Sequence, residues 1–542
     1  MNWAYRALFT LVLIKFALYA FVHPDYLIGH SLSDDAFYYL QIAKQAQQTG
    51  IFPTFDGRNL TNGFHLLYEL VLIPLVPLFD DSLLQVYAWV ITINVIFFII
   101  GLWFLSRVLN QYLPPWLAWV CIAFAGLATL STKIVAAGLE SSLAFMVAMG
   151  FLYALFIKHA RPWVLGILLG ALCLSRLDIG LFYGLTFALT GLWQIKLKKQ
   201  RVQDYVTTGV AAFAILLPWV IFNYSLFGEI ETISSATKQW VSSQLYLESD
   251  NLIATWIHAA LHYAKGILGN TVGDLVTLPF TLLSGQLPYA GEMGAVWHTL
   301  SSNWWKWLAI TLPIVLVAVV LGYRGLYPQL RPKPYPPWEL AAYLVLVPLA
   351  HFLLVTTKLL HLGGLWYWLF IPPAAAYALA LLAQQQNLIS RLACIALCLI
   401  PLTGAITLPL IMARVGAFSS DYHEVHWYSG PQEAAAFLTQ LQEPAVVGTF
   451  NAGMMGYISP QPVVNLDGLV NNWELLNARK EGSVAQYVQK QGITHIIDFG
   501  NPWRFLEATG LSPNQVDLVH QSATTEAFVL KVKPTQRKGS DD

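Results

Sequence analysis

The feature that most constrains this chain is a series of apolar stretches, each long enough to cross a bilayer as a helix. A hydrocarbon core of about 30 Å needs about 20 apolar residues per helix. With 56% hydrophobic and only 11% charged residues, the chain lies outside the range of soluble proteins. We therefore expect a polytopic α-helical membrane protein with eleven spans, at residues 4–22, 85–106, 114–131, 139–157, 163–177, 179–195, 205–227, 306–323, 338–356, 364–383 and 390–412.

Charge and cysteine content exclude several other classes of protein. Lys and Arg together number 30, as do Asp and Glu, so the balance gives no electrostatic support for binding nucleic acid. The four cysteines all lie in apolar runs and show no spacing of zinc ligands, which is typical of small buried side chains.

The distribution of Lys and Arg predicts which side of the membrane each loop occupies. The segment 64–79 is short and interrupted by Pro74 and Pro77, so we interpret it as an interfacial helix that does not cross. Nearly all the basic residues of short loops then fall on one side, which the positive-inside rule makes cytoplasmic. The sequence predicts a multi-pass plasma (inner) membrane protein. Its first outer loop (23–84, with juxtamembrane helices), its long outer loop (228–305) and its C-terminal part lie on the extracytoplasmic side.

Two adjacent carboxylates, Asp34 and Asp35, stand just after the first span, at the start of a predicted helix over 34–48. Ser33 or Asp34 suits the N-cap, and Gly50 is a plausible stop. Capping and solvation are the structural alternative to a catalytic role. One acid suffices for a cap, however, so this alternative leaves the second carboxylate unexplained.

After Met412 the composition changes, and strands alternate with a helix. We expect strands at 445–450, 462–467, 494–498, 516–519 and 527–532 and a helix near 473–491, hence a C-terminal extracytoplasmic α/β domain over 413–542 behind a transmembrane domain over 1–412. The stretch Asn451–Gly456 lacks the full GxGxxG pattern, which argues against nucleotide binding. We place Asp467, Asn471 and Asn472, at a strand end, toward the membrane active site.

Two histidines in the long outer loop, His258 and His262, are one helical turn apart and could ligate a metal. No third ligand lies nearby in the sequence, and histidines beside Trp256 and Tyr263 are more often interfacial. The interfacial interpretation is the one the sequence favours.

Several motifs of the first 200 residues resemble those of the GT-C superfamily of integral-membrane glycosyltransferases, whose better-known members are the protein O-mannosyltransferases and the lipid A aminoarabinose transferase. The motifs are Ser33-Asp34-Asp35-Ala36-Phe37-Tyr38-Tyr39, Thr61-Asn62-Gly63-Phe64-His65, Ala137-Gly138-Leu139-Glu140-Ser141 and Ser175-Arg176-Leu177-Asp178. The resemblance is closest to bacterial members of the DDAFYY…TNGFH type. It implies a GT-C-like bundle, and between residues 200 and 412 it is architectural only.

The resemblance implies a glycosyltransferase that moves a sugar from a polyprenyl-phosphate donor to an acceptor hydroxyl on a glycan, lipid or protein. It makes Asp34 the catalytic carboxylate and places a second outer acid at Glu140, while Asp35 holds the acceptor or, with Mg²⁺ or Mn²⁺, the phosphate. No cofactor is required with certainty. Groups suited to the donor phosphate or the acceptor are Arg58, Asn62, His65, Arg176, Asp178, Lys358 and His361.

Alternatives remain at several of these positions. Lys358 and His361 at a helix end suit an interfacial anchor equally well, and Arg176 with Asp178 suits a structural ion pair. The rival function is a transporter or a flippase of lipid-linked sugars, whose usual marks are acidic residues within spans, proton relays and internal repeats. In this sequence the charges gather at one face, and no repeat between the halves is seen. A third possibility is a scaffold whose C-terminal domain binds a cell-surface partner.

Overall fold

The computed structural model describes residues 2–78, 82–197, 201–247, 338–351, 369–384, 409, 412–413, 416–422, 428–441 and 443–534. The chain divides into two compact units. The helical unit comprises Met1–Leu27, Ala88–Pro218 and Leu245–Tyr422, and the mixed unit comprises Ile28–Tyr87, Trp219–Gln244 and His423–Asp542. The first loop and the C-terminal part, far apart in the sequence, therefore belong to one compact body.

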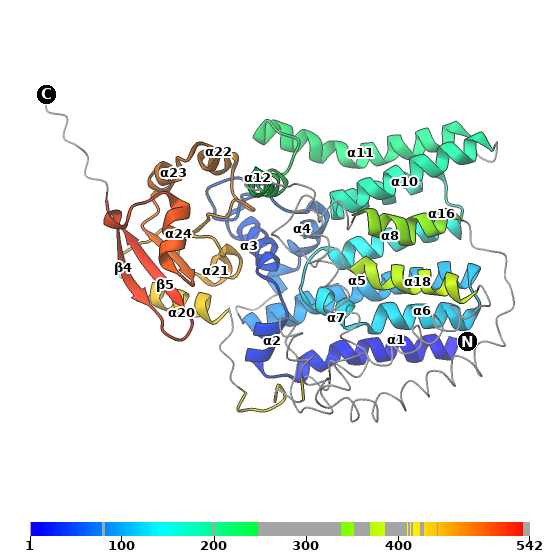
Figure 1. Ribbon diagram of the computed structural model, residues 1–542, viewed down its shortest axis with the longest axis horizontal. Helices are drawn as coiled ribbons and strands as arrows, with labels where there is room; N and C mark the ends of the chain where they lie inside the picture. The colour runs from blue at the N-terminus through cyan, green and yellow to red at the C-terminus, as the bar shows by residue number, and fades with distance from the viewer. Residues whose placement is uncertain are drawn as a thin grey trace. The chain divides into compact units, whose positions relative to one another are not determined.

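Within the helical unit, apolar helices lie side by side (Figure 1). They are α1 (Asn2–Ala17), α5 (Leu83–Tyr112), α6 (Pro115–Leu127), α7 (Thr129–Ala136), α8 (Ser141–Phe156), α9 (Pro162–Ser175), α10 (Leu177–Lys196), α11 (Val202–Phe227), α16 (Trp338–Ala341) and α18 (Ile371–Ala383). The 3₁₀ turn Leu18–Phe21 continues α1, and a π-helical turn to Leu346 continues α16. Of α5 and α11, only the parts from Ala88 onward and up to Pro218 belong to this unit. Proline at the first turn starts α6, α9 and α18, where its missing N–H costs no hydrogen bond.

Three helical segments of the described residues are long and apolar enough to cross a membrane: Trp3–Phe21, Leu83–Tyr112 and Val202–Phe227. A fourth arises if the pair Pro115–Leu127 and Leu130–Ala136, bent by 50°, counts as one span. The predicted total of eleven stays a prediction. The span expected at 306–323 lies outside the described residues, and so does the span at 390–412 except for two residues. The segment 64–79 forms only the short helix α4 (Leu66–Leu72) and the 3₁₀ turn Val76–Leu78.

The mixed unit contains a five-stranded sheet in the order β2–β1–β3–β5–β4. Its strands are β1 (Val447–Thr449), β2 (Val463–Asn465), β3 (His495–Phe499), β4 (Val516–Gln521) and β5 (Ala527–Val532), each at a position that the sequence predicts. The pairs β1–β2 and β1–β3 are parallel, whereas β3–β5 and β4–β5 are antiparallel. The carboxyl ends of β2, β1 and β3 therefore lie at one edge of the sheet.

The helices of the mixed unit are α3 (Asp34–Thr49), α4, α12 (Ile233–Leu247, to Gln244), α20 (Ser429–Thr439), α21 (Ala452–Ile458), α22 (Trp473–Glu481), α23 (Val484–Lys490) and α24 (Pro502–Thr509), while α2 (Pro24–His30) crosses the boundary between the units. The single helix expected over 473–491 is wrong. Gly482 takes a φ of 69°, a left-handed conformation that ends α22 and separates it from α23.

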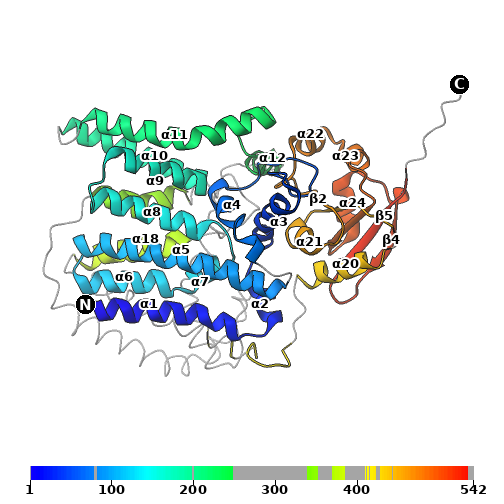
Figure 2. The same ribbon diagram turned by 180° about the vertical axis from the view of Figure 1, so that it is seen from behind.

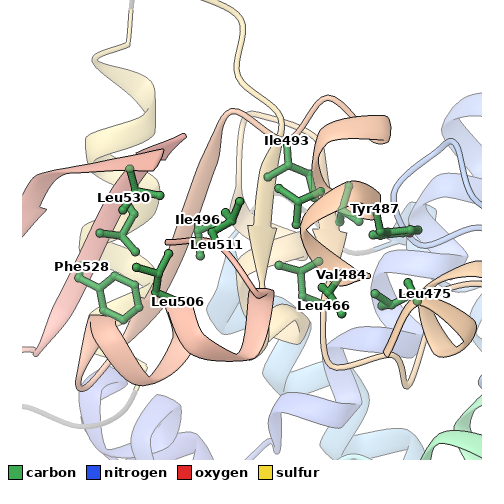
Figure 3. Packing of buried hydrophobic residues seen from close by; sticks show 14 residues of the cluster. Leu466, Leu475, Val484, Tyr487, Ile493, Ile496, Leu506, Leu511, Phe528 and Leu530 are labelled. Carbon is green, nitrogen blue, oxygen red and sulfur yellow. The ribbon is translucent and has the colours of Figure 1, made fainter. Parts of the chain in front are cut away.

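The core of the C-terminal part lies between the sheet and the helices α22, α23 and α24. Leu466, Ile496, Phe528 and Leu530 from the strand side meet Leu475, Val484, Tyr487 and Leu506 from the helices (Figure 3). This packing fixes the sheet, and with it the loops that follow its parallel strands.

Candidate active site

Helix α3 carries the acidic pair and forms as the sequence predicts. Ser33 occupies the N-cap position in an extended conformation, and Gly50 ends the helix with a φ of 70°. An apolar stripe on this helix, formed by Ala36, Phe37, Leu40 and Ala43, is buried. Because this stripe is covered, the first turn of α3 is held in a fixed position within the mixed unit.

The carboxylate of Asp34 caps a helix, but not its own. Gly453 N–H donates to Oδ2 of Asp34 at 3.0 Å, and Met454 N–H donates to Oδ1 at 2.9 Å. Both amides belong to the first turn of α21, where backbone N–H groups have no partner within the helix. Figures 1 and 2 both place α3 beside α21. The capping alternative is therefore realised by a helix more than 400 residues away in the sequence.

One turn further along α3, Tyr38 contacts the segment that follows β2. Its hydroxyl donates to Oδ2 of Asp467 at 2.6 Å and accepts from Nδ2 of Asn465 at 3.5 Å. Burial raises the pKa of Tyr38 well above its usual value, so the phenol keeps its proton and can donate. Within the mixed unit, Asp467 thus lies against the acidic helix, as its position at a strand end indicated.

The surroundings of Asp34 favour its protonated form. The pKa of this carboxyl is raised to about 7, mainly by burial and in smaller part by the neighbouring carboxylates Asp35 and Asp467, while the amides of Gly453 and Met454 oppose the rise. Hydrogen bonds stabilise a carboxylate, but two neutral donors do not compensate fully for lost hydration. Asp34 can therefore exchange a proton near neutral pH.

The loop from Asp56 to His65 is organised by the buried carboxylate of Asp56. Its Oδ1 accepts from the backbone N–H groups of Arg58 and Asn59 at 2.8 and 2.7 Å, which fixes the turn. Arg58 has an exposed side chain, and no described carboxylate pairs with its guanidinium. This loop therefore presents a cation that is available to an anionic ligand.

Asn62 has a structural task instead. Its amide is fully buried: Nδ2 donates to Oδ1 of Asn223 and to the carbonyl of Glu231, and Oδ1 accepts from Ile233 N–H at 2.8 Å. These bonds tie the loop to the segment before α12. His65 occupies the N-cap position of α4 and is partly buried.

In the helical unit, three predicted residues form one charged cluster. Arg176 donates to Glu140, and its Nε lies 3.1 Å from Oδ1 of Asp178, so the ion-pair alternative describes this arginine. Nε2 of His351 lies 2.8 Å from Oδ2 of Asp178. Glu140, Arg176 and His351 are all buried.

His351 is a member of this cluster that the sequence analysis did not single out. The available signal was an ionisable residue inside an apolar span, which is expensive to bury and usually has a partner. Asn465 and the amides of Gly453 and Met454 were missed too. No local pattern pointed to them, because their partners on α3 are distant in the sequence.

The remaining predicted groups are not placed. Lys358, His361, His258 and His262 lie outside the described residues. Among the residues that the structure does describe, no three or more His, Cys, Asp or Glu side chains are grouped so as to hold a metal ion. Each oxygen of Asp34 accepts one backbone N–H, and a role of Asp34 and Asp35 in binding Mg²⁺ or Mn²⁺ stays a prediction from the sequence.

Comparisons with known proteins give one family match and several similar structures. Residues 420–536 match the model of a domain of unknown function, DUF8728. No curated protein matches the sequence. A structure of ArnT from Cupriavidus metallidurans bound to undecaprenyl phosphate is similar at 12% identity and a TM-score of 0.47, covering 97% of this chain and 98% of that one.

Two further structures are similar at the same level. The Archaeoglobus fulgidus oligosaccharyltransferase tethered with an acceptor peptide shares 13% identity at a TM-score of 0.48, covering 99% of this chain and 75% of that one. Arabinofuranosyltransferase AftD from Mycobacteria shares 12% identity at a TM-score of 0.40, covering 98% of this chain and 42% of that one. All three are GT-C glycosyltransferases, the superfamily that the sequence motifs resemble. At these scores the similarities say nothing about individual residues.

Proposed function

We propose that this protein is a membrane glycosyltransferase that moves a sugar from a polyprenyl-phosphate donor to an acceptor hydroxyl, with Asp34 as the general base. One observation carries the proposal. Asp34 is a carboxyl group whose pKa is raised to about 7 by burial, and only neutral donors fix its orientation. A base with a pKa near the working pH combines a useful ionised fraction with a useful driving force for proton transfer.

The reaction requires few groups. The acceptor oxygen attacks the anomeric carbon and forms the new C–O bond, while the bond from that carbon to the phosphate oxygen breaks. The electron pair leaves with the polyprenyl phosphate, and the acceptor proton passes to Asp34. Each amide bond to Asp34 uses one lone pair of a carboxylate oxygen, which leaves further lone pairs to receive this proton.

The leaving phosphate gains negative charge and needs a cation or a hydrogen-bond donor. Arg58 suits this task because its guanidinium is exposed on a fixed turn, and His65 lies on the same loop. Arg176 is a weaker candidate, since Glu140 and Asp178 already balance its charge. Lys358 and His361 stay candidates from the sequence alone.

Asp35 and Asp467 are the acids next to the base, and we assign them to the acceptor side. Both carboxylates are partly exposed, and both raise the pKa of Asp34. A carboxylate accepts hydrogen bonds from sugar hydroxyl groups, so this pair could orient a polyhydroxylated acceptor. No step of the proposal requires a divalent metal.

The site and the C-terminal domain are proposed to lie on the extracytoplasmic side, which follows from the distribution of Lys and Arg among the loops. Ile51 is 45% exposed and immediately follows α3, so it offers a position for labelling. Ile51→Cys, in a chain whose four native cysteines are replaced by alanine, should react with an impermeant thiol reagent in intact cells. Protection until the cells are lysed would place the site on the opposite side.

The direct test is sugar transfer by purified protein in detergent with a polyprenyl-phosphate sugar. Asp34→Asn should slow release of polyprenyl phosphate by about 10²–10⁴-fold, whereas Asp421→Asn, the same change at an exposed aspartate, should leave it unchanged. Activity in detergent also excludes the rival function, because a transporter or flippase catalyses no net change without two compartments. Full activity of Asp34→Asn would remove Asp34 from the mechanism.

A further inference from the structure

We propose that the C-terminal α/β domain is a structural part of the catalytic centre, because the carboxyl edge of its parallel strands holds α3 and fixes the Asp34 carboxylate. The inference rests on the proposed function of Asp34 and assigns a role to the segment that matches a domain of unknown function. In this proposal the domain positions the catalytic base and is not a separate binding module.

The first argument is the place where α3 lies. In open α/β sheets, ligands bind at the carboxyl ends of the parallel strands. Here the segments after β1 and β2 contact α3 of the same chain. Asp34 of α3 accepts hydrogen bonds from the amides of α21, which follows β1, and Tyr38 of α3 donates to Asp467, which follows β2. The usual ligand edge of the sheet is thus used by the helix that carries the acidic pair.

The second argument is the anchoring of the segment that leads into α21. Asp498, at the end of β3, is buried and accepts from the backbone N–H groups of Phe450 and Asn451 at 2.9 and 3.2 Å. It also accepts from Nδ2 of Asn451 at 2.6 Å and from Oγ1 of Thr449 at 3.3 Å. Asn451 directly precedes α21, so Asp498 fixes the point from which the amides of Gly453 and Met454 project.

A similar anchor fixes the segment after β2. Arg479 on α22 donates to the carbonyl oxygens of Asp467 and Leu466 at 2.6 and 2.5 Å, and Asn465 accepts from Gly468 N–H at 2.8 Å. Since these groups bind backbone, the position of Asp467 beside Tyr38 does not depend on Tyr38 itself. Asp498 and Arg479 act through other residues and are positioning residues.

The third argument is steric. A Cβ atom built on Gly453 would lie 2.0 Å from the carbonyl oxygen of Asp34, and one on Gly456 would lie 2.3 Å from the ring of Phe55. Real Cβ contacts are never this short, so α21 approaches α3 and its loop as closely as only glycine permits. A Cβ atom built on Gly63 would likewise lie 1.8 Å from the carbonyl oxygen of Leu469.

The contact itself can be tested without measuring activity. In the full-length protein in detergent, hydrogen exchange of a peptide covering 452–458 reports the amides of Gly453 and Met454. Asp34→Ala removes their acceptor and should accelerate exchange there by about tenfold or more, with the strands β4 and β5 unchanged. Glu474→Ala, an exposed change in the same domain, should have no effect. Unchanged exchange in Asp34→Ala would overturn the inference.

The functional consequence is tested with two variants that leave Asp34 in place. Asp498→Asn keeps the size of the side chain but turns an N–H group toward the donors of the 449–451 segment. Gly453→Ala adds a Cβ atom that forces α21 away from α3. Each should lower kcat for sugar transfer about tenfold to a hundredfold, with the KM of the donor nearly unchanged, because a displacement of about 1 Å is enough to cost this much. Gly209→Ala, on α11 with open space around it, is the matched control.

The outcomes separate the two proposals. If Asp498→Asn accelerates exchange at 452–458 but leaves kcat unchanged, the domain does not hold the base for catalysis, and Asp34 can still be the base. If Asp34→Asn retains full transfer, the proposed function fails, and the inference fails with it. If Gly453→Ala does not fold, the isosteric Asp498→Asn still decides.

Discussion

The two acidic clusters of this protein bind their carboxylates in opposite ways. In the mixed unit, Asp34 is held by two backbone amides, both of them neutral donors. In the helical unit, Glu140 and Asp178 share the guanidinium of Arg176. The amides in the mixed unit orient a carboxylate without compensating its charge. The guanidinium in the helical unit compensates the charge of the carboxylates that it binds.

This difference supports the proposal that Asp34, and not Glu140, is the base. A buried carboxylate next to a guanidinium stays ionised and is a poor base, because taking up a proton would leave the arginine charge uncompensated. A buried carboxylate among neutral donors has no such constraint. We therefore assign the base to Asp34, and we assign Glu140 to keeping Arg176 in place.

The largest expected effect is that of Asp34→Asn on turnover. Loss of a general base costs about 10²–10⁴-fold, so kcat should fall by that factor while the amount of folded protein stays normal. Glu140→Gln, compared per mole of folded protein, should retain most of its kcat. Equal losses of kcat in the two variants would contradict the distinction between the clusters.

The next effect concerns stability. Glu140→Gln removes one partner of a buried arginine, and breaking a buried pair in this way costs about 3–5 kcal/mol. Thermal unfolding in detergent should therefore shift strongly downward. The double variant Glu140→Gln with Arg176→Gln should recover part of the loss, since no buried charge is left unpaired. A double variant that only adds the two single losses would show that the pair is not coupled.

A smaller effect is expected in the pH profile of kcat/KM. Burial raises the pKa of Asp34 to about 7, and the base must be ionised to accept a proton. The rate should therefore fall as the pH drops below about 7, approaching tenfold per unit. The groups that act on Asp34 are Asp35 on its own helix, Asp467 after β2 and the amides of α21, and the phenols of Tyr38, Tyr87 and Tyr428 also lie within its electrostatic reach. A flat profile between pH 5.5 and 8 would exclude a base with this pKa.

The smallest effect is that of Tyr38→Phe. The change removes the hydrogen bond to Asp467, and because this carboxylate is partly exposed, water can replace the lost donor. We expect loss of this hydrogen bond to cost about 1 kcal/mol of free energy. The cost should be seen as a few-fold lower kcat or as a slightly lower unfolding temperature. An effect as large as that of Asp34→Asn would move Tyr38 into the catalytic machinery.

Much of the architecture could be predicted because its signals are local. Runs of β-branched residues located the five strands, and Gly50 marked the end of α3. The helix expected over 473–491 failed at Gly482, whose left-handed conformation interrupts it although the residues on both sides favour a helix. Local propensity alone does not show whether a glycine inside such a run is tolerated or ends the helix.

The site was predicted only in part, for a physical reason. The types and positions of Asp34, Glu140 and Arg176 drew attention because charge is costly near lipid. Which acid pairs with an arginine and which with backbone amides depends on tertiary contacts that leave no local trace. Asn62 shows the same limit, since its motif suggested a ligand but gave no sign that its amide ties the loop to the segment before α12.

The bond between Asp34 and Gly453 joins positions 419 residues apart, and this has a consequence for biosynthesis. At about 5–20 residues per second, a ribosome needs roughly 20–80 s to make the intervening chain. Throughout that time the nascent protein contains its acidic pair but not the amides that orient it. If Asp34 is the base, as proposed, a chain truncated before α21 would lack the amides that orient it, and we expect such a product to be inactive.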